Sequence, residues 1–163
     1  MSVDGNSFKT TMRRWVSGVT IVTSHAKDVA SGEERDAGMT VSAFSSVSAE
    51  PPLVVVCLHA LTRTHAAVEA SGVFAVNLLS SEQEVLSARF ATSTAERFDG
   101  LTIRRGLTGA ALIDGAIAQL ECELVSSHRE GTHTLFVGKV LACSTAPGEP
   151  LLYAAGGYRR LLP

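Results

Sequence analysis

Alternating apolar and polar residues dominate the chain, a pattern typical of β-strands with one buried face. The strand-like segments are bounded by residues that favour turns. Strands are predicted at residues 19–24, 37–44, 53–59, 73–79, 117–125, 134–143 and 151–153, with one short additional strand at 101–104. Six to eight strands without a repeat of fixed period predict a mainly antiparallel barrel rather than a doubly wound sheet.

Three segments depart from simple alternation. Residues 53–59 are continuously apolar, which predicts a central strand that is buried on both faces. The pair Pro51-Pro52 removes two backbone donors and is expected to separate this strand from the segment before it. The charged residues 28–36 are expected at a solvated hairpin tip, and the Gly- and Arg-rich residues 97–111 are expected to be mainly irregular.

Residues 117–125 and 134–143 are predicted to pair as a long antiparallel hairpin. In the first segment, apolar residues alternate with Gln119, Glu121 and Glu123, which predicts a strand with one solvent-exposed face. An exposed hairpin of this length also favours self-association, because two such barrels can bury their sides and form clefts between them.

Short helices are predicted between the strands. Near the N-terminus, a cap at Asn6 or Ser7 begins a helix that is expected to end at Gly18. The apolar residues of its inward face recur at i, i+4, i+7 and i+8, namely Phe8, Met12, Trp15 and Val16. A second helix is predicted at about 64–70 and is closed by Gly72.

Two helix starts carry hydroxyl groups. Ser81 and Glu84 have the spacing of a capping box, which predicts a third helix with Val85, Leu86 and Phe90 directed inward. Thr62 and Thr64 stand at the start of the second helix, where ordinary N-capping is the simpler interpretation. The alternative is that these hydroxyls and the free backbone N–H groups bind a phosphate.

A further group of hydroxyls lies in the strand predicted at 37–44 and just beyond it. Thr40 and Ser42 share the face opposite to the apolar residues Met39, Val41 and Ala43. Residues 45–48 continue this hydroxyl-rich stretch through a bend. It is either a solvated strand face or a wall against the edge of a planar polar ring, and composition alone leaves both possibilities open.

The composition indicates one domain that spans residues 1–163, with 45% hydrophobic residues for its core. The 14 basic and 16 acidic residues give no electrostatic reason to expect binding to nucleic acid or a membrane surface. The first residues do not resemble a leader peptide, and the longest apolar run, 53–58, is far shorter than a bilayer span. A soluble cytoplasmic protein is therefore expected.

Few residues suggest side-chain chemistry. Cys57, Cys122 and Cys143 show no CxxC spacing and are predicted to be buried reduced thiols. The five histidines lack the spacing of a helical metal site, so no metal is expected. The sequence also lacks GxGxxG, GxxxxGK[ST], HExxH and GxSxG motifs.

Several short motifs occur in an order that resembles the flavin reductase-like family, the short-chain NAD(P)H:flavin oxidoreductases. The resemblance extends over about residues 14–161, nearly the whole chain. The motifs are GMTVSAF (38–44), SVS (46–48), PPLV (51–54), FAVNLL (74–79), RFA (89–91), LEC (120–122), GTHTLFVG (131–138), PLLY (150–153) and YR (158–159). A single one of these motifs would be weak evidence for the family, but several of them in the same order are specific for it.

The resemblance implies an FMN-binding split β-barrel, antiparallel with Greek-key topology and two or three short helices, that forms a homodimer. It also implies that NADH, or less readily NADPH, reduces free FAD or FMN, which then diffuses to a partner monooxygenase. Hydride transfer between two stacked rings requires orientation and no side-chain acid or base. Two alternatives remain open, namely a tightly bound FMN electron-transfer protein and a non-catalytic barrel that binds a ligand or protein.

The resemblance also implies roles for individual residues. Flavin would contact twelve of them: Thr40, Val41, Ser42 and Ala43 at the ring edge, Ser46 and Ser48 toward the ribityl and phosphate side, Cys57 and Leu58 in the pocket wall, Thr62 and Thr64 at the phosphate, and Arg89 and Phe90 at the flank. Nicotinamide would contact His133, Tyr158 and Arg159. Thr132 stands where the family more often has Asp, and a strand-edge histidine bonded to backbone is the alternative interpretation of His133.

Overall fold

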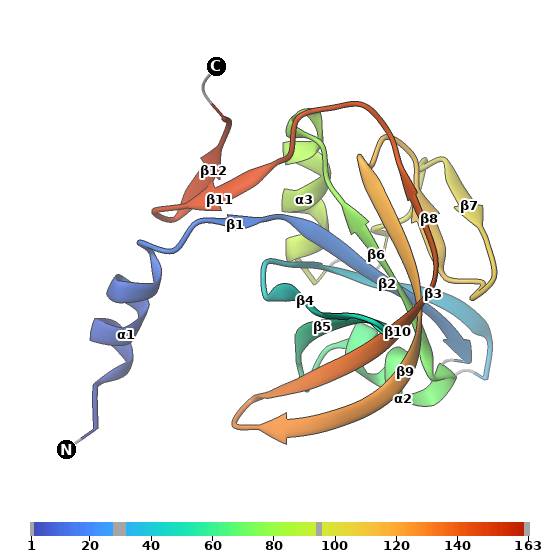
Figure 1. The fold of residues 1–163 in the computed structure, drawn as a ribbon, viewed down its shortest axis with the longest axis horizontal. Helices are drawn as coiled ribbons and strands as arrows, with labels where there is room; N and C mark the ends of the chain where they lie inside the picture. Colours follow the sequence, from blue (N-terminus) through green and yellow to red (C-terminus); the bar gives the residue numbers. More distant parts are fainter. Residues whose placement is uncertain (1, 28–31, 94–95, 162–163) are drawn as a thin grey trace.

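An antiparallel sheet of seven strands forms the centre of the structure, in the order β3-β2-β6-β9-β10-β5-β4 (Figure 1). The computed structural model describes residues 2–27, 32–93 and 96–161. The strands of this sheet are β2 (Thr20–Lys27), β3 (Glu34–Val41), β4 (Phe44–Ala49), β5 (Pro52–His59), β6 (Val73–Leu78), β9 (Ala118–Glu130) and β10 (His133–Thr145).

Smaller elements surround this sheet. Two short sheets consist of β1 (Ser17–Gly18) with β11 (Leu152–Ala154) and β12 (Gly157–Arg159), and of β7 (Ile103–Arg105) with β8 (Ala111–Ile113). The helices are α1 (Gly5–Met12), α2 (Arg63–Ser71) and α3 (Glu84–Ala91), and a 3₁₀ turn, η1 (Ser81–Gln83), leads into α3. Within the described residues, no helix is long and apolar enough to cross a membrane.

The sheet closes because its two edge strands are consecutive in the chain. β3 ends at Val41 and β4 begins at Phe44, so only Ser42 and Ala43 join the two edges. The carbonyl of Ala43 accepts a hydrogen bond from the Cys57 amide on β5 at 3.0 Å. In the ladders formed by the described residues, β3 pairs with β2 and β4 pairs with β5. The edges therefore meet at a two-residue seam without a ladder between them, which is the geometry of a split barrel.

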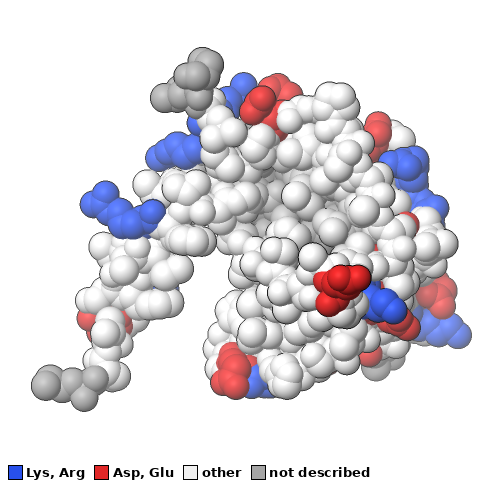
Figure 2. Space-filling model, viewed as in Figure 1, with Lys and Arg blue, Asp and Glu red and all other residues white. Residues whose placement is uncertain are grey.

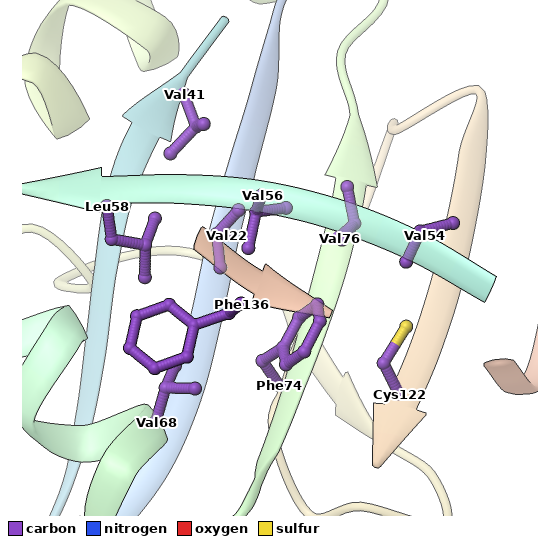
Figure 3. Packing of buried hydrophobic residues seen from close by; sticks show 10 residues of the cluster. All are labelled: Val22, Val41, Val54, Val56, Leu58, Val68, Phe74, Val76, Cys122 and Phe136. Carbon is purple, nitrogen blue, oxygen red and sulfur yellow. The ribbon is translucent and has the colours of Figure 1, made fainter. Parts of the chain in front are cut away.

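The barrel interior is filled by apolar side chains from its strands and from α2. Alternate residues of each strand point inward, as a strand with period two requires. Figure 3 shows Phe74 and Phe136 among the aliphatic side chains that surround them. The buried cluster comprises Val22, Val41, Val54, Val56, Leu58, Val68, Phe74, Val76, Cys122 and Phe136. Val68 comes from α2, so this helix closes one end of the barrel.

The fold class predicted from the sequence is confirmed. The strands expected at 19–24, 73–79 and 134–143 correspond to β2, β6 and β10. α2 ends at Gly72, whose left-handed φ of 69° allows the chain to turn away. The segment expected as one strand at 37–44 instead breaks at the seam into β3 and β4. At the predicted tip of residues 28–36, residues 28–31 lie outside the described residues, and β3 already begins at Glu34.

The prediction that residues 53–59 are buried on both faces was wrong. In β5, Val54, Val56 and Leu58 are buried inside the barrel, whereas Val55 and Cys57 are only half-buried on the outer face. β5 also lies next to the edge strand β4 rather than at the centre of the sheet. Its outer face is apolar, but the described part of the chain covers it incompletely.

The predicted exposed face of β9 is in fact buried at two positions. Gln119 and Glu121 are 5% and 6% exposed. The Gln119 amide donates to the Ile113 carbonyl on β8 at 2.8 Å, and the Glu121 carboxylate accepts from the Thr108 amide at 2.8 Å. These polar side chains are buried because the β7–β8 segment covers them and supplies hydrogen-bond partners.

The N-terminal helix differs from its prediction. Asp4 caps α1 by accepting from the amides of Asn6 and Ser7, and the helix ends at Met12 rather than at Gly18. None of its eight residues, all of which the structure describes, is buried. The apolar side chains expected to face inward are exposed: Phe8 60%, Met12 48%, Trp15 69% and Val16 54%. The helix stands apart from the barrel (Figure 1), so the part of the chain that the structure describes does not cover its apolar face.

Two details of α3 were also predicted wrongly. The capping box is formed by Ser80 and Gln83, one residue before the predicted pair, because the 3₁₀ turn precedes the helix. Phe90 is buried as expected, but Val85 is 83% exposed and lies on the outer side of the helix. The inward position predicted for Phe90 is therefore confirmed, whereas Val85 is an apolar residue on the surface.

The cysteines agree only in part with the expectation of burial. All three are free thiols. Cys122 is buried in the barrel, where burial first and the nearby Glu121 second raise the pKa of its thiol to about 12. Cys57 is half-buried, and burial raises the pKa of its thiol. Cys143 is exposed because it points outward from β10, so its predicted burial was wrong.

Gly138 is expected to be required for the packing of the barrel interior. A Cβ at this position of β10 would lie 2.4 Å from Phe74 Cζ and 3.0 Å from Cys122 Cβ. Gly138→Ala should lower the free energy of unfolding by about 1–3 kcal/mol, measured by urea denaturation, because the buried ring has no space to move into. Gly18→Ala is the matched control, since a Cβ there meets no described atom within 4 Å. Equal stability of the two variants would contradict this account.

Candidate functional site

A cleft of about 630 Å³ lies beside the seam of the barrel. It is bordered by the end of β3, the start of α2, the end of α3 with the loop after it, and the β11–β12 hairpin. Its lining residues are Val19, Met39, Thr40, Ser42, Thr62, Ser87, Phe90, Ala91, Thr92, Ser93, Arg97, Tyr153 and Tyr158. The cleft thus combines an apolar floor with hydroxyl groups, two tyrosines and one arginine, and its volume suits a small organic ligand.

Close packing between α3 and β3 forms the floor of the cleft. Phe90 is 1% exposed and belongs to a second apolar cluster outside the barrel. A Cβ at Gly38 on β3 would lie 2.9 Å from both Phe90 Cε1 and Phe98 Cζ. Gly38 therefore allows the two rings, which meet edge-to-face at 5.0 Å, to approach the strand.

Hydrogen bonds join three walls of the cleft at Ser87 on α3. The Thr40 hydroxyl on β3 donates to the Ser87 carbonyl at 2.6 Å. The Tyr158 hydroxyl on β12 donates to Ser87 Oγ at 2.9 Å. Tyr158 also meets Tyr153 edge-to-face, with ring centroids 5.6 Å apart. Thr40 is thus already bonded to protein, whereas Ser42 lies exposed beyond the end of the strand.

Thr62 is the N-cap of α2. Its Oγ1 accepts from the His65 amide at 3.2 Å and donates to the His59 carbonyl at 2.8 Å. The capping interpretation is therefore confirmed for Thr62, which also lines the cleft. Thr64 is only 1% exposed and lies outside the lining, because it follows the cap on a side of the helix that packs inward.

The cleft carries positive charge. The Arg97 guanidinium donates to the Gly38 carbonyl at 2.6 Å. Burial first, and the positive charge of Arg63 second, lower the pKa of Arg97. Acidic side chains do not occur among the described residues that line the cleft, so Arg97 is the charged residue of that lining.

The structure brings together five of the residues predicted for the site. These cleft-lining residues are Thr40, Ser42, Thr62, Phe90 and Tyr158. Val41 and Leu58 belong to the barrel core instead. Ala43 lies at the seam, Ser46 and Ser48 lie on the edge strand β4, and Cys57 lies on the adjacent β5, all outside the lining.

The two predicted arginines are bonded to the protein backbone. Arg89 donates to the carbonyls of Glu96 and Asp99 at 2.5 and 2.7 Å, and so ties α3 to the loop that follows it. Arg159 donates to the Tyr158 carbonyl at 2.7 Å. Neither of them is in the cleft lining.

His133 lies at the start of β10, at the end of the long hairpin. Its ring meets that of His59 edge-to-face at 5.1 Å, and its Nδ1 is 2.9 Å from Thr132 Oγ1. Its observed partner is therefore a hydroxyl rather than the backbone. The Ala60 amide donates to the Thr132 carbonyl at 3.0 Å, which places this hairpin end beside the segment that leads to Thr62.

Sequence reasoning missed three cleft residues that are central to its geometry: Ser87, Arg97 and Tyr153. A signal existed for Ser87, which is a small polar residue three positions before the buried Phe90 and thus on the same helix face. Tyr153 lay within the motif PLLY but received no role. Arg97 lies in a segment without periodicity, and its tertiary contact with β3 is what identifies it here.

Comparisons with known proteins identify the family of the chain. Residues 12–162 match the family described as "Flavin reductase like domain". The chain is 36% identical to the FMN reductase (NADH) SmoA of Agrobacterium fabrum, over 96% of this chain and 86% of that protein. It is 38% identical to the reductase component of an FADH(2)-dependent resorcinol hydroxylase of Rhizobium sp., over 94% and 86% of the two chains.

A solved structure shares the fold over its full length. It is an NADH:FAD oxidoreductase of Streptomyces globisporus in complex with NAD and FAD fragments. The TM-score is 0.89 and the identity 33%, over 100% of this chain and 98% of that one.

Thr62 is expected to stabilise α2 through its cap. Thr62→Ala should lower the free energy of unfolding by about 0.5–2 kcal/mol, because the His65 amide then loses its acceptor. Chemical denaturation measures the loss. Thr62→Ser retains the acceptor and should stay close to the unsubstituted protein, so equal losses in both variants would argue against the cap.

Proposed function

The chain belongs to the flavin reductase-like domain family, and we propose that it uses NADH to reduce free flavin for a separate monooxygenase. The match over residues 12–162 carries this proposal. The cleft supports it, because four of the motifs that resemble the family supply residues to one lining: Thr40 and Ser42, Phe90, Tyr153, and Tyr158.

The residues of the cleft fit a flavin. An isoalloxazine ring has two apolar faces and a polar edge, and Met39 and Phe90 provide apolar surface beside the hydroxyls of Thr40 and Ser42. Thr62, the backbone N–H groups at the start of α2 and the positive charge of Arg97 suit the phosphate end. We therefore assign the phosphate contact to Thr62 rather than to the buried Thr64.

The chain's own residues have mainly to bind and orient the two substrates. Bound flavin supplies the acceptor for the hydride of NADH. Phe90 and Met39 exclude water from one side of the cleft, and Thr40, fixed by its bond to Ser87, sets the position of the polar wall. We assign the nicotinamide side to Tyr158 in the cleft lining, and extend it to Arg159 and to His133 at the hairpin end, which both lie outside that lining. Such a site gains rate from proximity and orientation, without a side-chain acid or base.

We further propose that the protein forms a homodimer. α1 is too short to be stable alone in water, and its apolar side chains are exposed. The outer faces of β5 and β10 add a half-buried apolar strip, in which Val55 lies opposite Val137 and Cys57 opposite Leu135. Figure 2 shows open space between α1 and the body, bordered mainly by uncharged residues, where a second copy could be received.

A cytoplasmic location also belongs to this proposal. The three cysteines are free thiols, which suits a reducing compartment.

The proposed activity predicts that NADH oxidation rises with added free flavin. Initial rates should be measured for NADH and NADPH, each with FMN and with FAD, with NADH preferred over NADPH. A yellow protein that shows no turnover with added flavin would instead indicate a tightly bound FMN electron carrier. A colourless protein that binds no flavin would indicate a non-catalytic barrel.

Substitution of Trp15 by Glu should dissociate the proposed homodimer. A charge at this 69% exposed side chain would become buried in the assembly and oppose it. Sedimentation velocity should show a shift toward monomer at concentrations where the unsubstituted chain is dimeric. Val85→Glu, at an exposed apolar residue on α3, is the control and should leave the dimer intact. An unsubstituted chain that sediments as a monomer would refute the homodimer.

A further inference from the structure

Ser87 is fully buried from solvent, and it is also one of the residues that border the cleft. Its two polar groups bond to two different walls. The backbone carbonyl accepts from Thr40 on β3, and the side-chain Oγ accepts from Tyr158 on β12. One residue of α3 therefore sets the position of both walls, through chemically separate groups.

Within the described residues, the wall that contains Tyr158 is joined to its neighbours mainly by short ladders and by backbone bonds of Leu151 to Val19 and Leu79. β11 pairs with β1 through only two residue pairs, and β12 pairs with β11 through three. The Ala155 amide adds one bond to the Arg13 carbonyl. Short ladders of this kind contribute little stability, so a side-chain bond to α3 has a large share in fixing the hairpin.

Contacts around Tyr158 fix its ring at both ends. The ring packs against the apolar cluster that contains Phe90, while its hydroxyl is held by Ser87. Tyr153 then contacts Tyr158 edge-to-face and is 39% exposed at the cleft. Arg160 also contacts η1, with an ion pair to Glu82 at 3.4 Å, but outside the cleft lining. The bond to Ser87 is therefore the side-chain hydrogen bond that orients the aromatic pair toward the cleft.

We propose that Ser87 is a positioning residue that holds Tyr158, and through it Tyr153, in the orientation that receives nicotinamide. This rests on the proposed reductase function and assigns to Ser87 a role that acts through Tyr158. The β3 wall, which we assign to flavin, is held through the backbone carbonyl of Ser87, and this carbonyl remains whatever the side chain at position 87. The β12 wall, which we assign to nicotinamide, is held through the Ser87 hydroxyl, which substitution by alanine removes. Loss of the hydroxyl should consequently affect the two substrates differently.

The test compares Ser87→Ala with Tyr158→Phe, which removes the same hydrogen bond from its other end and keeps the ring. Each variant should raise the KM for NADH about three- to tenfold, as expected for loss of one hydrogen bond. The flavin Kd, measured by quenching of flavin fluorescence, should change less than twofold. The double variant should resemble either single variant, because both remove one interaction.

Ser24→Ala is the matched control. Ser24 is also fully buried, and its hydroxyl donates to the Val73 carbonyl at 2.8 Å, but it lies outside the cleft lining. This variant should lose stability without a change in the KM for NADH. Equal effects of Ser87→Ala on NADH and flavin, additive effects in the double variant, or a KM unchanged as in Ser24→Ala would each overturn the proposal.

Hydrogen exchange gives a readout that does not require turnover. Amides of residues 152–159 should exchange faster in Ser87→Ala and in Tyr158→Phe than in Ser24→Ala. Absence of NADH oxidation in the unsubstituted protein would refute the reductase function, whereas this exchange difference would still support the positioning of the hairpin by Ser87. Unchanged exchange in both variants would refute the positioning role even in an active reductase. If Ser87→Ala does not fold, Tyr158→Phe alone decides between these outcomes.

Discussion

The two-residue link between β3 and β4 is the constraint on which the rest of the structure depends. Ser42 and Ala43 join the opposite edges of a seven-stranded sheet, so the sheet has to curve until those edges meet. Curvature brings inward residues of the strands into one core, in which Phe74 and Phe136 are the largest side chains. The two edges meet without a ladder between them, so side chains rather than strand pairing surround the seam. The cleft lies beside this seam.

Helix α3 turns the open seam into a site with defined walls. It lies against β3 because Gly38 has no side chain, and it carries both the apolar floor and the polar connection to the neighbouring walls. The carbonyl and the hydroxyl of Ser87 on this helix accept hydrogen bonds from Thr40 and Tyr158. These bonds hold the helix in place in the absence of a ligand. Preorganisation of this kind suits a reaction that depends on the relative position of two rings. The cleft that results is lined mainly by hydroxyl, aromatic and apolar groups.

Local patterns predicted the elements well, because period, caps and turn residues act over a few positions. The end of α2 at Gly72 and the buried Phe90 are examples. Prediction failed where burial depends on a distant segment. Gln119 and Glu121 are buried by β7 and β8, which are three residues long and too short to show a period. Thr62 and Thr64, two positions apart, differ in access to the cleft because the first precedes the helix and the second lies within it.

About a third of the predicted site residues line the cleft, and the reason is again physical. A shared motif identifies a segment, but alternate residues of a strand face opposite sides, so Thr40 reaches the cleft while Val41 enters the core. The connections made by Ser87 and Arg97 join parts of the chain that are tens of residues apart, and no local pattern encodes them.

The exposed segment after α1 also contains the chain's one tryptophan, Trp15. Its indole lies in solvent, away from the core and outside the cleft lining. Tryptophan emission from this protein therefore reports on the surroundings of the N-terminal segment and not on the state of the barrel. The molecule therefore carries a built-in optical probe of whatever comes to cover that segment.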